Sequence, residues 1–173
     1  GRSVAPLPFS SSVYLASEAI LRFGTEAQKS AWLPRLASGE CVATVAMAEC
    51  AGRLALDQLE TRRSGSQVSG TKVPVADASI AEVAVVLARS QSGLEACFVP
   101  LQQAGVSVEP VLTFDTSRGH STVTFDGAEA EVLGDTAINP EDWESLLDGA
   151  AVLLAWEQLG LAGERVRDRA VLT

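Results

Sequence analysis

The stretch GTEAQKSAWLPRLASGE, residues 24–40, decides the fold prediction, because it carries helix signals at both ends and is followed by a different periodicity. Thr25 and Gln28 have the spacing of a capping box, in which each side chain bonds the other residue's backbone amide at the start of a helix. Gly39 is expected to end this helix, and Pro34 inside it predicts a kink or an early end. The stretch therefore closes a helical zone.

The residues before this stretch also have a helical pattern. Ser12 is the expected N-cap of a helix whose apolar residues recur at helical spacing as far as Phe23. Gly24 follows the last turn and is expected to end the helix in the C′ position.

The residues from Cys41 onwards change to short segments rich in Val, Thr and Ala, separated by turn residues. This pattern predicts seven strands, at residues 41–48, 58–63, 67–75, 82–89, 94–100, 106–110 and 121–125. Turns are expected at 64–65, 91–93 and 126–127. Short strands joined by hairpin-like turns favour an antiparallel barrel or sandwich.

The last zone is helical again. Asn139 and Pro140 followed by two acidic residues are typical of a helix N-terminus. The apolar period then continues to the end of the chain, and such a long stripe indicates a helical bundle whose other helices lie elsewhere. The expected fold is α+β, with a helical segment at 1–39, a β-domain at 40–137 and the first helix of a C-terminal bundle at 138–173. We expect the chain to be part of a longer protein.

The composition excludes several classes of partner. The 173 residues include 22 acidic and 13 basic side chains, which gives a net charge of −9. A chain this acidic is a poor ligand for nucleic acid or an anionic membrane, because its basic residues cluster only weakly, at Arg62–Arg63 and at Arg165–Arg169. No uninterrupted apolar run approaches the roughly 18 residues of a membrane span, so a cytoplasmic protein is expected.

The cysteines and the histidine give no sign of a metal site or of a hydrolase. Cys41, Cys50 and Cys97 are odd in number and lack metal-ligand spacing, so we expect reduced thiols in the core. His120 is the single histidine, and no G-x-S-x-G nucleophile elbow accompanies it. We therefore expect His120 to be an ordinary loop or strand-edge residue.

Several motifs resemble the acyl-CoA dehydrogenase family. Residues 24–40 are similar to the family's entry into the β-domain, G-x-x-x-Q-K-x-x-x-L-P-x-L-x-x-G-E, and residues 69–72, SGTK, resemble its N-G-x-K turn. Further similar segments precede, leave and follow the β-domain, at 1–9, 125–134 and 157–160. The run DTSR, 115–118, resembles a divergent branch common in actinobacteria, in which steroid and fatty-acyl catabolism are frequent.

The resemblance implies an activity. Family members remove the α-proton of an acyl-CoA with a glutamate, while the β-hydrogen passes as hydride to N5 of FAD. The family's fold is an N-terminal helical domain, a β-barrel domain and a C-terminal four-helix bundle, and the implied assembly is a tetramer-like oligomer of paralogous or identical subunits. The implied ligands are FAD and an acyl-CoA.

The resemblance also locates the positions that would contact the flavin, and most have lost their usual chemistry. The family's T-E-P-x-A-G-S-D loop corresponds to AECAGRL, residues 48–54, and its W-I-T run to PVA, residues 74–76. The candidate cofactor-binding residues are therefore Met47, Ala48, Glu49, Val75 and Ala76, with Met47 and Val75 contributing backbone contacts. Each missing hydroxyl contact costs about 0.5–1.5 kcal/mol of binding.

The implied base is missing as well. In one branch of the family it lies ten residues before the glycine that matches Gly160, and Ala150 occupies that position. Ala151 replaces the arginine that usually follows it. In the other branch the base lies beyond residue 173. An alanine has no exchangeable side-chain proton, so we name no catalytic residue.

Three interpretations follow. The first is a degenerate subunit, whose catalytic partner chain supplies the base and holds or shares the FAD. The second is a self-sufficient FAD-dependent acyl-CoA dehydrogenase in which other contacts replace the lost ones. The third is a non-catalytic acyl-binding or structural module on the same fold.

Overall fold

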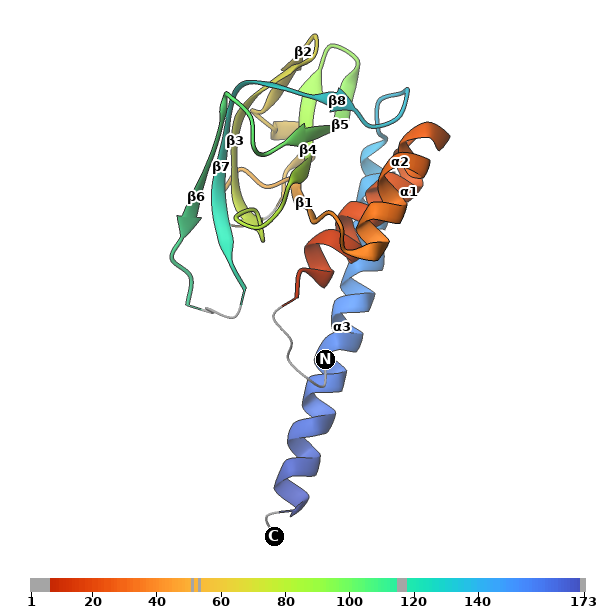
Figure 1. Ribbon diagram of the computed structural model, residues 1–173, viewed down its shortest axis with the longest axis vertical. Coiled ribbons are helices and arrows are strands. Elements are labelled where there is room, and N and C mark those ends of the chain that lie inside the picture. The colour runs from red at the N-terminus through yellow and green to blue at the C-terminus, as the bar shows by residue number, and fades with distance from the viewer. Residues whose placement is uncertain (1–6, 51, 53, 115–117, 172–173) are drawn as a thin grey trace.

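The computed structural model describes residues 7–50, 52, 54–114 and 118–171, with side chains in the last helix described to residue 163. Its helical elements are η1 (Phe9–Ser17), α1 (Glu18–Phe23), α2 (Glu26–Ser38), η2 (Leu56–Gln58) and α3 (Pro140–Val171). Its strands are β1 (Ala43–Ala46), β2 (Arg62–Ser64), β3 (Gln67–Ala76), β4 (Val83–Ser90), β5 (Gly93–Pro100), β6 (Val106–Val111), β7 (His120–Glu129) and β8 (Glu131–Val132). The N-terminal helices lie beside α3, and the sheet lies to one side of both (Figure 1).

The first helix begins earlier than the sequence predicts. It starts at Phe9, and its first nine residues are π-helical before α1 takes over. Ser12 is therefore not an N-cap but a buried residue whose Oγ accepts a hydrogen bond from the Ala43 amide, at 3.4 Å. Gly24 ends the helix in an extended conformation, where a Cβ would lie 2.6 Å from the Ile20 carbonyl oxygen. A close approach of the backbone, rather than a positive φ, thus explains this glycine.

The second helix confirms the capping box. The Thr25 hydroxyl accepts from the Gln28 amide at 3.2 Å, and the Gln28 side chain accepts from the Thr25 amide at 3.1 Å. The helix continues through Pro34 to Ser38, so it does not end early, and Gly39 follows with a left-handed φ of 76°. The side-chain Nε2 of Gln28 also donates to the Val132 carbonyl at 2.8 Å, which fastens the helix to β8.

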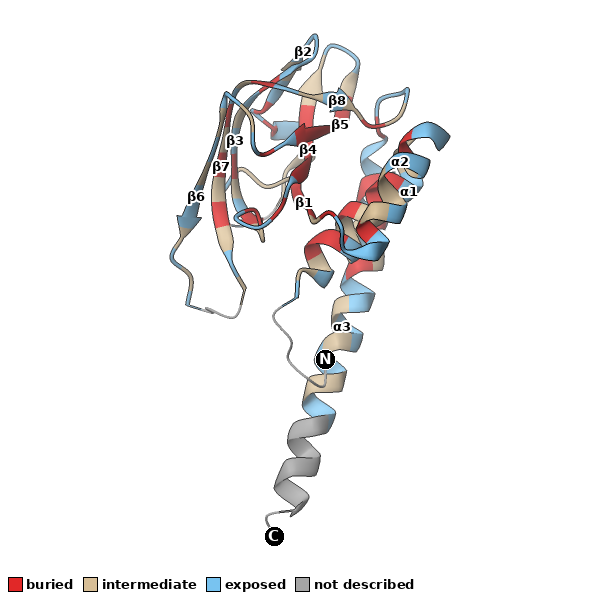
Figure 2. Ribbon diagram, in the orientation of Figure 1, coloured by how far each residue is buried: buried red, intermediate tan, exposed pale blue. Residues whose placement is uncertain are grey.

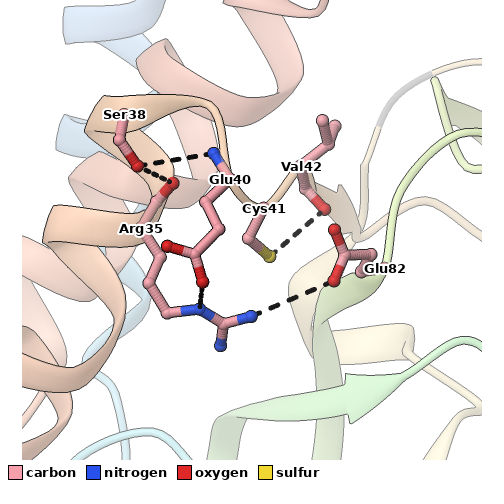
Figure 3. A network of polar contacts seen from close by, with 6 residues as sticks. All are labelled: Arg35, Ser38, Glu40, Cys41, Val42 and Glu82. Atoms are coloured by element: carbon pink, nitrogen blue, oxygen red, sulfur yellow. Dashed lines mark hydrogen bonds and ion pairs between the residues drawn. The ribbon is translucent and has the colours of Figure 1, made fainter.

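A polar junction fixes the chain where α2 passes into the sheet (Figure 3). The Arg35 guanidinium contacts the Glu40 carboxylate at 3.2 Å and the Glu82 carboxylate at 4.0 Å. Cys41 lies buried beneath them, and this burial, reinforced by the charge of Glu82, raises the pKa of its thiol. Cys97 is also buried, whereas Cys50 is exposed, which corrects the expectation that all three thiols lie in the core.

The strands form a mixed sheet rather than a purely antiparallel one. Seven strands follow the order β6-β7-β3-β2-β4-β5-β8, and β1 pairs with β4 off this path. The β1–β4 and β2–β4 pairs are parallel, and the other pairs are antiparallel. Hairpin turns join β2 to β3 and β4 to β5, as predicted. The parallel partners lie one after the other along the same edge of β4, with β1 beside residues 83–86 and β2 beside Arg89.

Two details of strand prediction are wrong for local reasons. Asp126 and Gly127 do not form a turn but lie inside β7, where one extra residue shifts the register against β3 between Val68 and Gly70. Gly127 has a φ of 62°, which suits the distorted backbone of such a bulge. The strand predicted at 58–63 is shorter than expected, because Gln58 ends a short 3-10 helix and β2 covers only Arg62–Ser64.

The buried residues form two clusters on opposite faces of β4 and β5, two strands that are largely buried (Figure 2). One cluster packs β1, β4 and β5 against the helices, and Trp32 stacks on Phe98 there with ring centroids 5.0 Å apart. The other cluster fills the space between β3–β7 and β4–β5, around Phe125 and Val86. The sheet therefore curls around its own core, which gives the barrel-like β-domain and confirms the α+β fold.

The last helix is anchored at its beginning and exposed further along. The Glu141 amide donates to the Asn139 side-chain oxygen at 3.2 Å, so Asn139 caps the helix as predicted. Trp143 is fully buried and stacks on Phe23, at 5.8 Å between ring centroids. Farther along, Trp156 is 68% exposed, and the apolar neighbours Val152, Leu153 and Leu159 are exposed with it.

The same helix is one weak candidate for a membrane span, although no uninterrupted apolar run in the sequence approaches that length. Among the described residues, Pro140–Gly163 is long and apolar enough to cross a membrane; its mean hydropathy is 1.2, and 11% of an 18-residue stretch within it is buried. Asp148 and Glu157 interrupt its apolar runs, so a search for uninterrupted apolar residues misses it. Length and composition alone are weak evidence, because a bundle helix passes the same test.

Candidate functional site

A buried lysine organises the region to which the sequence assigns the flavin loop. Lys72 lies in β3 with no exposed surface, and its Nζ donates to the Met47 carbonyl oxygen at 3.0 Å and to Glu49 Oε1 at 2.9 Å. Burial lowers the pKa of Lys72 to about 8, against the opposing effect of Glu49. A buried ammonium needs such partners, so Lys72 ties loop 47–49, which follows β1, to the interior of the sheet.

The carboxylate of Glu49 is bonded on its other side to the backbone that precedes β2. It accepts from the Glu60 amide at 2.6 Å and from the Thr61 amide at 2.8 Å. Burial alone would raise the pKa of Glu49, but these amides and Lys72 lower it to about 2. Glu49 is therefore a structural anion at neutral pH that holds three chain segments together.

Gly70 makes this arrangement possible. Its φ is 143°, and a Cβ there would lie 2.5 Å from Thr61 Oγ1 and 2.7 Å from Thr61 Cα. Only glycine allows the backbone at Thr61 to approach β3 so closely. The SGTK run at 69–72 is thus not a turn but part of β3, with the glycine allowing β2 to approach and the lysine fastening the loop.

The structure brings the two matched flavin-loop runs together. The Val73 amide donates to the Ala48 carbonyl at 2.9 Å, and the Thr44 hydroxyl donates to the Ala76 carbonyl at 2.5 Å. Val75 is fully buried opposite Ser121 in β7, whereas Ala48 and Ala76 are half-buried. Met47, Ala48, Glu49, Val75 and Ala76 therefore belong to one connected region, although their sequence positions fall in two groups.

This region lacks the side-chain groups that a flavin ring would need from the chain alone. Ala48, Pro74 and Ala76 offer no hydroxyl and no aromatic ring. The hydroxyl of Thr44 is already donated to the Ala76 carbonyl, and the Glu49 carboxylate is occupied by amides and by Lys72. The loop framework fits a flavin cradle, but the side chains do not fit a self-sufficient one.

The position that the resemblance assigns to the base of one family branch is also filled by a core residue. Ala150 lies on α3 with 4% of its surface exposed, so its methyl group serves packing. No group of three or more metal-binding side chains occurs among the described residues. His120 begins β7, and its Nδ1 is buried without a described partner.

Two polar features escaped the sequence analysis. Lys72 has the same strand parity as the buried Val68, so the alternation of β3 could have placed it inside. Arg118 donates to Ser10 Oγ and to Glu157 Oε1, both at 2.6 Å, and so joins the segment before β7 to η1 and α3. No local pattern reveals that contact, because its partners lie 108 and 39 residues away. Residues 115–117 of the DTSR run lie outside the described residues.

Known proteins resemble this chain in sequence and fold. A family model for the acyl-CoA dehydrogenase N-terminal domain matches residues 1–40. (2S)-methylsuccinyl-CoA dehydrogenase of Cereibacter sphaeroides is 35% identical over 130 residues, which are 69% of this chain and 22% of that protein. The chain spans about a fifth to a third of the length of the curated relatives it matches.

Two solved structures extend the likeness to the fold. The Tcur3481-Tcur3483 steroid ACAD has a TM-score of 0.80 and 29% identity, over 98% of this chain and 46% of that one. A glutaryl-CoA dehydrogenase from Mycobacterium smegmatis in complex with FADH2 has a TM-score of 0.71 and 26% identity, over 82% of this chain and 39% of that one. Together with the motifs at 24–40 and 69–72, these likenesses lead to one conclusion: the chain belongs to the acyl-CoA dehydrogenase family.

Proposed function

We propose that this chain is a degenerate subunit of an FAD-dependent acyl-CoA dehydrogenase, working with a partner chain that supplies the base and most of the flavin ring contacts. The observation that carries the proposal is a contrast within one region. The framework of the flavin loop is intact in Glu49, Gly70 and Lys72, whereas the matched contact positions are Ala48 and Ala76.

The chain's own residues have a positioning role in this proposal. Lys72 and Glu49 hold loop 47–49 in a fixed shape, so that its backbone can lie against a cofactor without reorganising. FAD, when bound, supplies the hydride acceptor for α,β-dehydrogenation of an acyl-CoA. The M. smegmatis relative holds FADH2, which supports FAD as the cofactor here.

The proposed assembly is a tetramer-like hetero-oligomer with a paralogous subunit, in the cytoplasm. The exposed apolar residues of α3 support an assembly in which further helices cover them. The Tcur3481-Tcur3483 steroid ACAD carries two joined designations and the word steroid, which supports a paralogous partner and a steroid-type acyl chain as one candidate substrate. We divide the chain into a helical part at 1–39, a β-domain at 40–137 and a C-terminal helical part from 138.

The test is co-purification of the complete gene product with paralogues encoded beside it. The flavin-to-protein ratio and the acyl-CoA-dependent reduction of an artificial electron acceptor are measured for each chain alone and for the complex. We expect a flavin-poor, inactive chain and a flavin-containing, active complex. The complete chain carrying stoichiometric FAD and oxidising acyl-CoA by itself would refute the proposal.

A matched pair of variants assigns the base within the active complex. Ala150→Ser in this chain should leave kcat unchanged, because position 150 supplies no proton acceptor. Replacement of the partner's carboxylate base should abolish activity while flavin remains bound. If loss of activity instead followed a carboxylate of this chain, the partner would not supply the base.

A further inference from the structure

The last helix, α3, is packed against the rest of the molecule near its beginning and then projects away from it (Figure 1). Its buried side chains among the described residues are Trp143, Leu146 and Ala150, and those at 151–163 are exposed or half-buried. At a rise of about 1.5 Å per residue, the part of α3 beyond Ala150 is about 30 Å long. A small change of direction at Ala150 therefore becomes a large displacement at the far end.

One ion pair links the projecting part of α3 to the sheet. Arg118, which lies just before β7, donates from Nη2 to Glu157 Oε1 at 2.6 Å. Glu157 lies about 10 Å along the helix from Ala150, and its Oε2 is buried without a partner among the described residues. In the described part of the chain, no other hydrogen bond or ion pair joins a side chain at 151–163 to another element. The pair therefore acts on α3 well beyond its packed beginning.

Arg118 also belongs to a closed ring of polar contacts at one end of the sheet. Its Nη1 donates to Ser10 Oγ at 2.6 Å, and the neighbouring Ser11 donates to Asp77 Oδ2 at 2.6 Å. The Asp77 amide donates to the Gly119 carbonyl at 2.9 Å, and Gly119 follows Arg118 in the chain. The ring thus joins η1 to the residue after β3 and to the residues before β7.

The same ring adjoins a candidate flavin contact. Ala76 precedes Asp77 and is the register partner of His120, which lies two residues after Arg118. The Ala76 carbonyl accepts from the Thr44 hydroxyl at 2.5 Å, so its place in the sheet is fixed. Arg118 therefore contacts α3 with its side chain, while its own backbone lies beside the end of β3 that carries Ala76.

We propose that Arg118 is a positioning residue that sets the direction of α3 relative to the end of the sheet that carries Ala76. Its planar guanidinium donates to η1 and to α3 at once, so it fixes an angle where a single hydrogen bond would fix only a distance. The exposed apolar residues of α3, Val152 and Trp156 among them, are thereby held in one place relative to the flavin-contact positions. The consequence for flavin rests on the proposed function, whereas the direction of α3 does not.

The distance between two spin labels, measured by double electron–electron resonance in the complete chain, tests the direction of α3. Ser107→Cys places one label at an exposed position of β6, and Gln158→Cys places the other at an exposed position of the projecting part of α3. Every exposed cysteine, Cys50 included, is first replaced by serine, whereas Cys41 and Cys97 are buried and stay in place.

We expect one narrow distance distribution when Arg118 is present and a broader, shifted one for Arg118→Gln. Arg22→Gln is the matched control, because Arg22 also links α3 to another helix, at 3.2 Å from Ser145 Oγ, but within the packed beginning of α3. It should keep the narrow distribution. An unaltered distribution in Arg118→Gln would overturn the proposal, as would equal broadening in both variants.

A rescue series separates positioning from general destabilisation. Arg118→Lys keeps the charge but loses the planar fork, so it should restore the distribution only in part. Arg118→Glu combined with Glu157→Arg should give a narrower distribution than Arg118→Glu alone, and equal widths would overturn the ion pair as the cause. The melting temperature of Arg118→Gln should stay near that of the wild type, because the paired side chains are 37% and 25% exposed and such pairs contribute little to stability.

Equilibrium dialysis of FAD tests the consequence for the flavin-contact positions. In the flavin-containing complex, Arg118→Gln should lower the affinity for FAD by about tenfold, which is typical of coupling between sites, and Arg22→Gln should leave it unchanged. Unchanged affinity in Arg118→Gln would overturn the link between α3 and these positions. An altered distance distribution in a chain that forms no flavin-containing complex would support the positioning of α3 while refuting the proposed enzyme.

Discussion

The inner side of loop 47–49, which faces the sheet interior, keeps its polar contacts, whereas the matched flavin-contact positions beside it have lost their polar side chains. On the side that faces the sheet interior, the hydrogen bonds of Lys72 and Glu49 and the close approach at Gly70 join the loop after β1 to β3 and to the segment before β2. At the contact positions, Ala48 and Ala76 provide only small side chains. The difference teaches that the shape of a cofactor loop and the chemistry of its contacts are separable, because shape depends on buried partners and contact chemistry on a few substitutable side chains.

Removal of the buried Lys72 ammonium should destabilise the inner side of the loop more than any other change proposed here. Lys72→Met leaves the Met47 carbonyl and the Glu49 carboxylate without their buried partner, which should lower the free energy of unfolding by about 4 kcal/mol. Chemical denaturation measures the change. The double variant Lys72→Met/Glu49→Gln should recover part of the loss, and a Lys72→Met variant as stable as the wild type would contradict the role of the ion pair.

Low pH should destabilise the inner side of the loop, because it protonates the Glu49 carboxylate. The folded pKa of about 2 lies below the ordinary value of 4.5, so the unfolded chain binds the proton first as the pH falls. The stabilisation is therefore present above pH 4.5 and is lost between about pH 4.5 and 2, a total of about 3 kcal/mol. Unfolding measured across this range should show a steeper loss in the wild type than in Glu49→Gln, and equal slopes would refute it.

A methyl group at Gly70 should separate β2 from β3. Gly70→Ala places a Cβ within 2.7 Å of the Thr61 backbone at a φ of 143°, and should cost about 2 kcal/mol or more. Gly39→Ala is the control, since its φ is also positive but no atom lies within 4 Å of the added Cβ. Gly70→Ala should therefore have a clearly lower melting temperature than Gly39→Ala. Equal melting temperatures would mean that only the positive φ matters and that the contact with Thr61 does not.

Restoring a hydroxyl at a contact position should leave the fold nearly unchanged. Ala48→Thr is expected to alter unfolding by less than about 1 kcal/mol, while flavin retention in the complex rises by up to about tenfold. Equilibrium dialysis of FAD measures the rise, with Ala48→Val as the control of equal size. An equal effect of both variants would mean that the hydroxyl does not reach the flavin.

Much of the fold was readable because its signals are local. The capping box at Thr25, the αL glycine at Gly39 and the cap at Asn139 each involve residues within a few positions of one another. The β-hairpins at 64–66 and 91–92 were equally readable, since turn residues mark them. The start of the first helix was missed because buried Ser12 is bonded to Ala43, far along the chain.

The candidate site divides in the same way. The sequence by itself determined which residue types occupy the matched flavin positions, and so determined that the hydroxyls and the base are absent from positions 48, 76 and 150. Only the tertiary structure decided that Lys72 is buried against Glu49 and that Arg118 reaches Glu157. Residue chemistry is local, whereas burial and strand register arise from segments that meet only when the whole sheet closes.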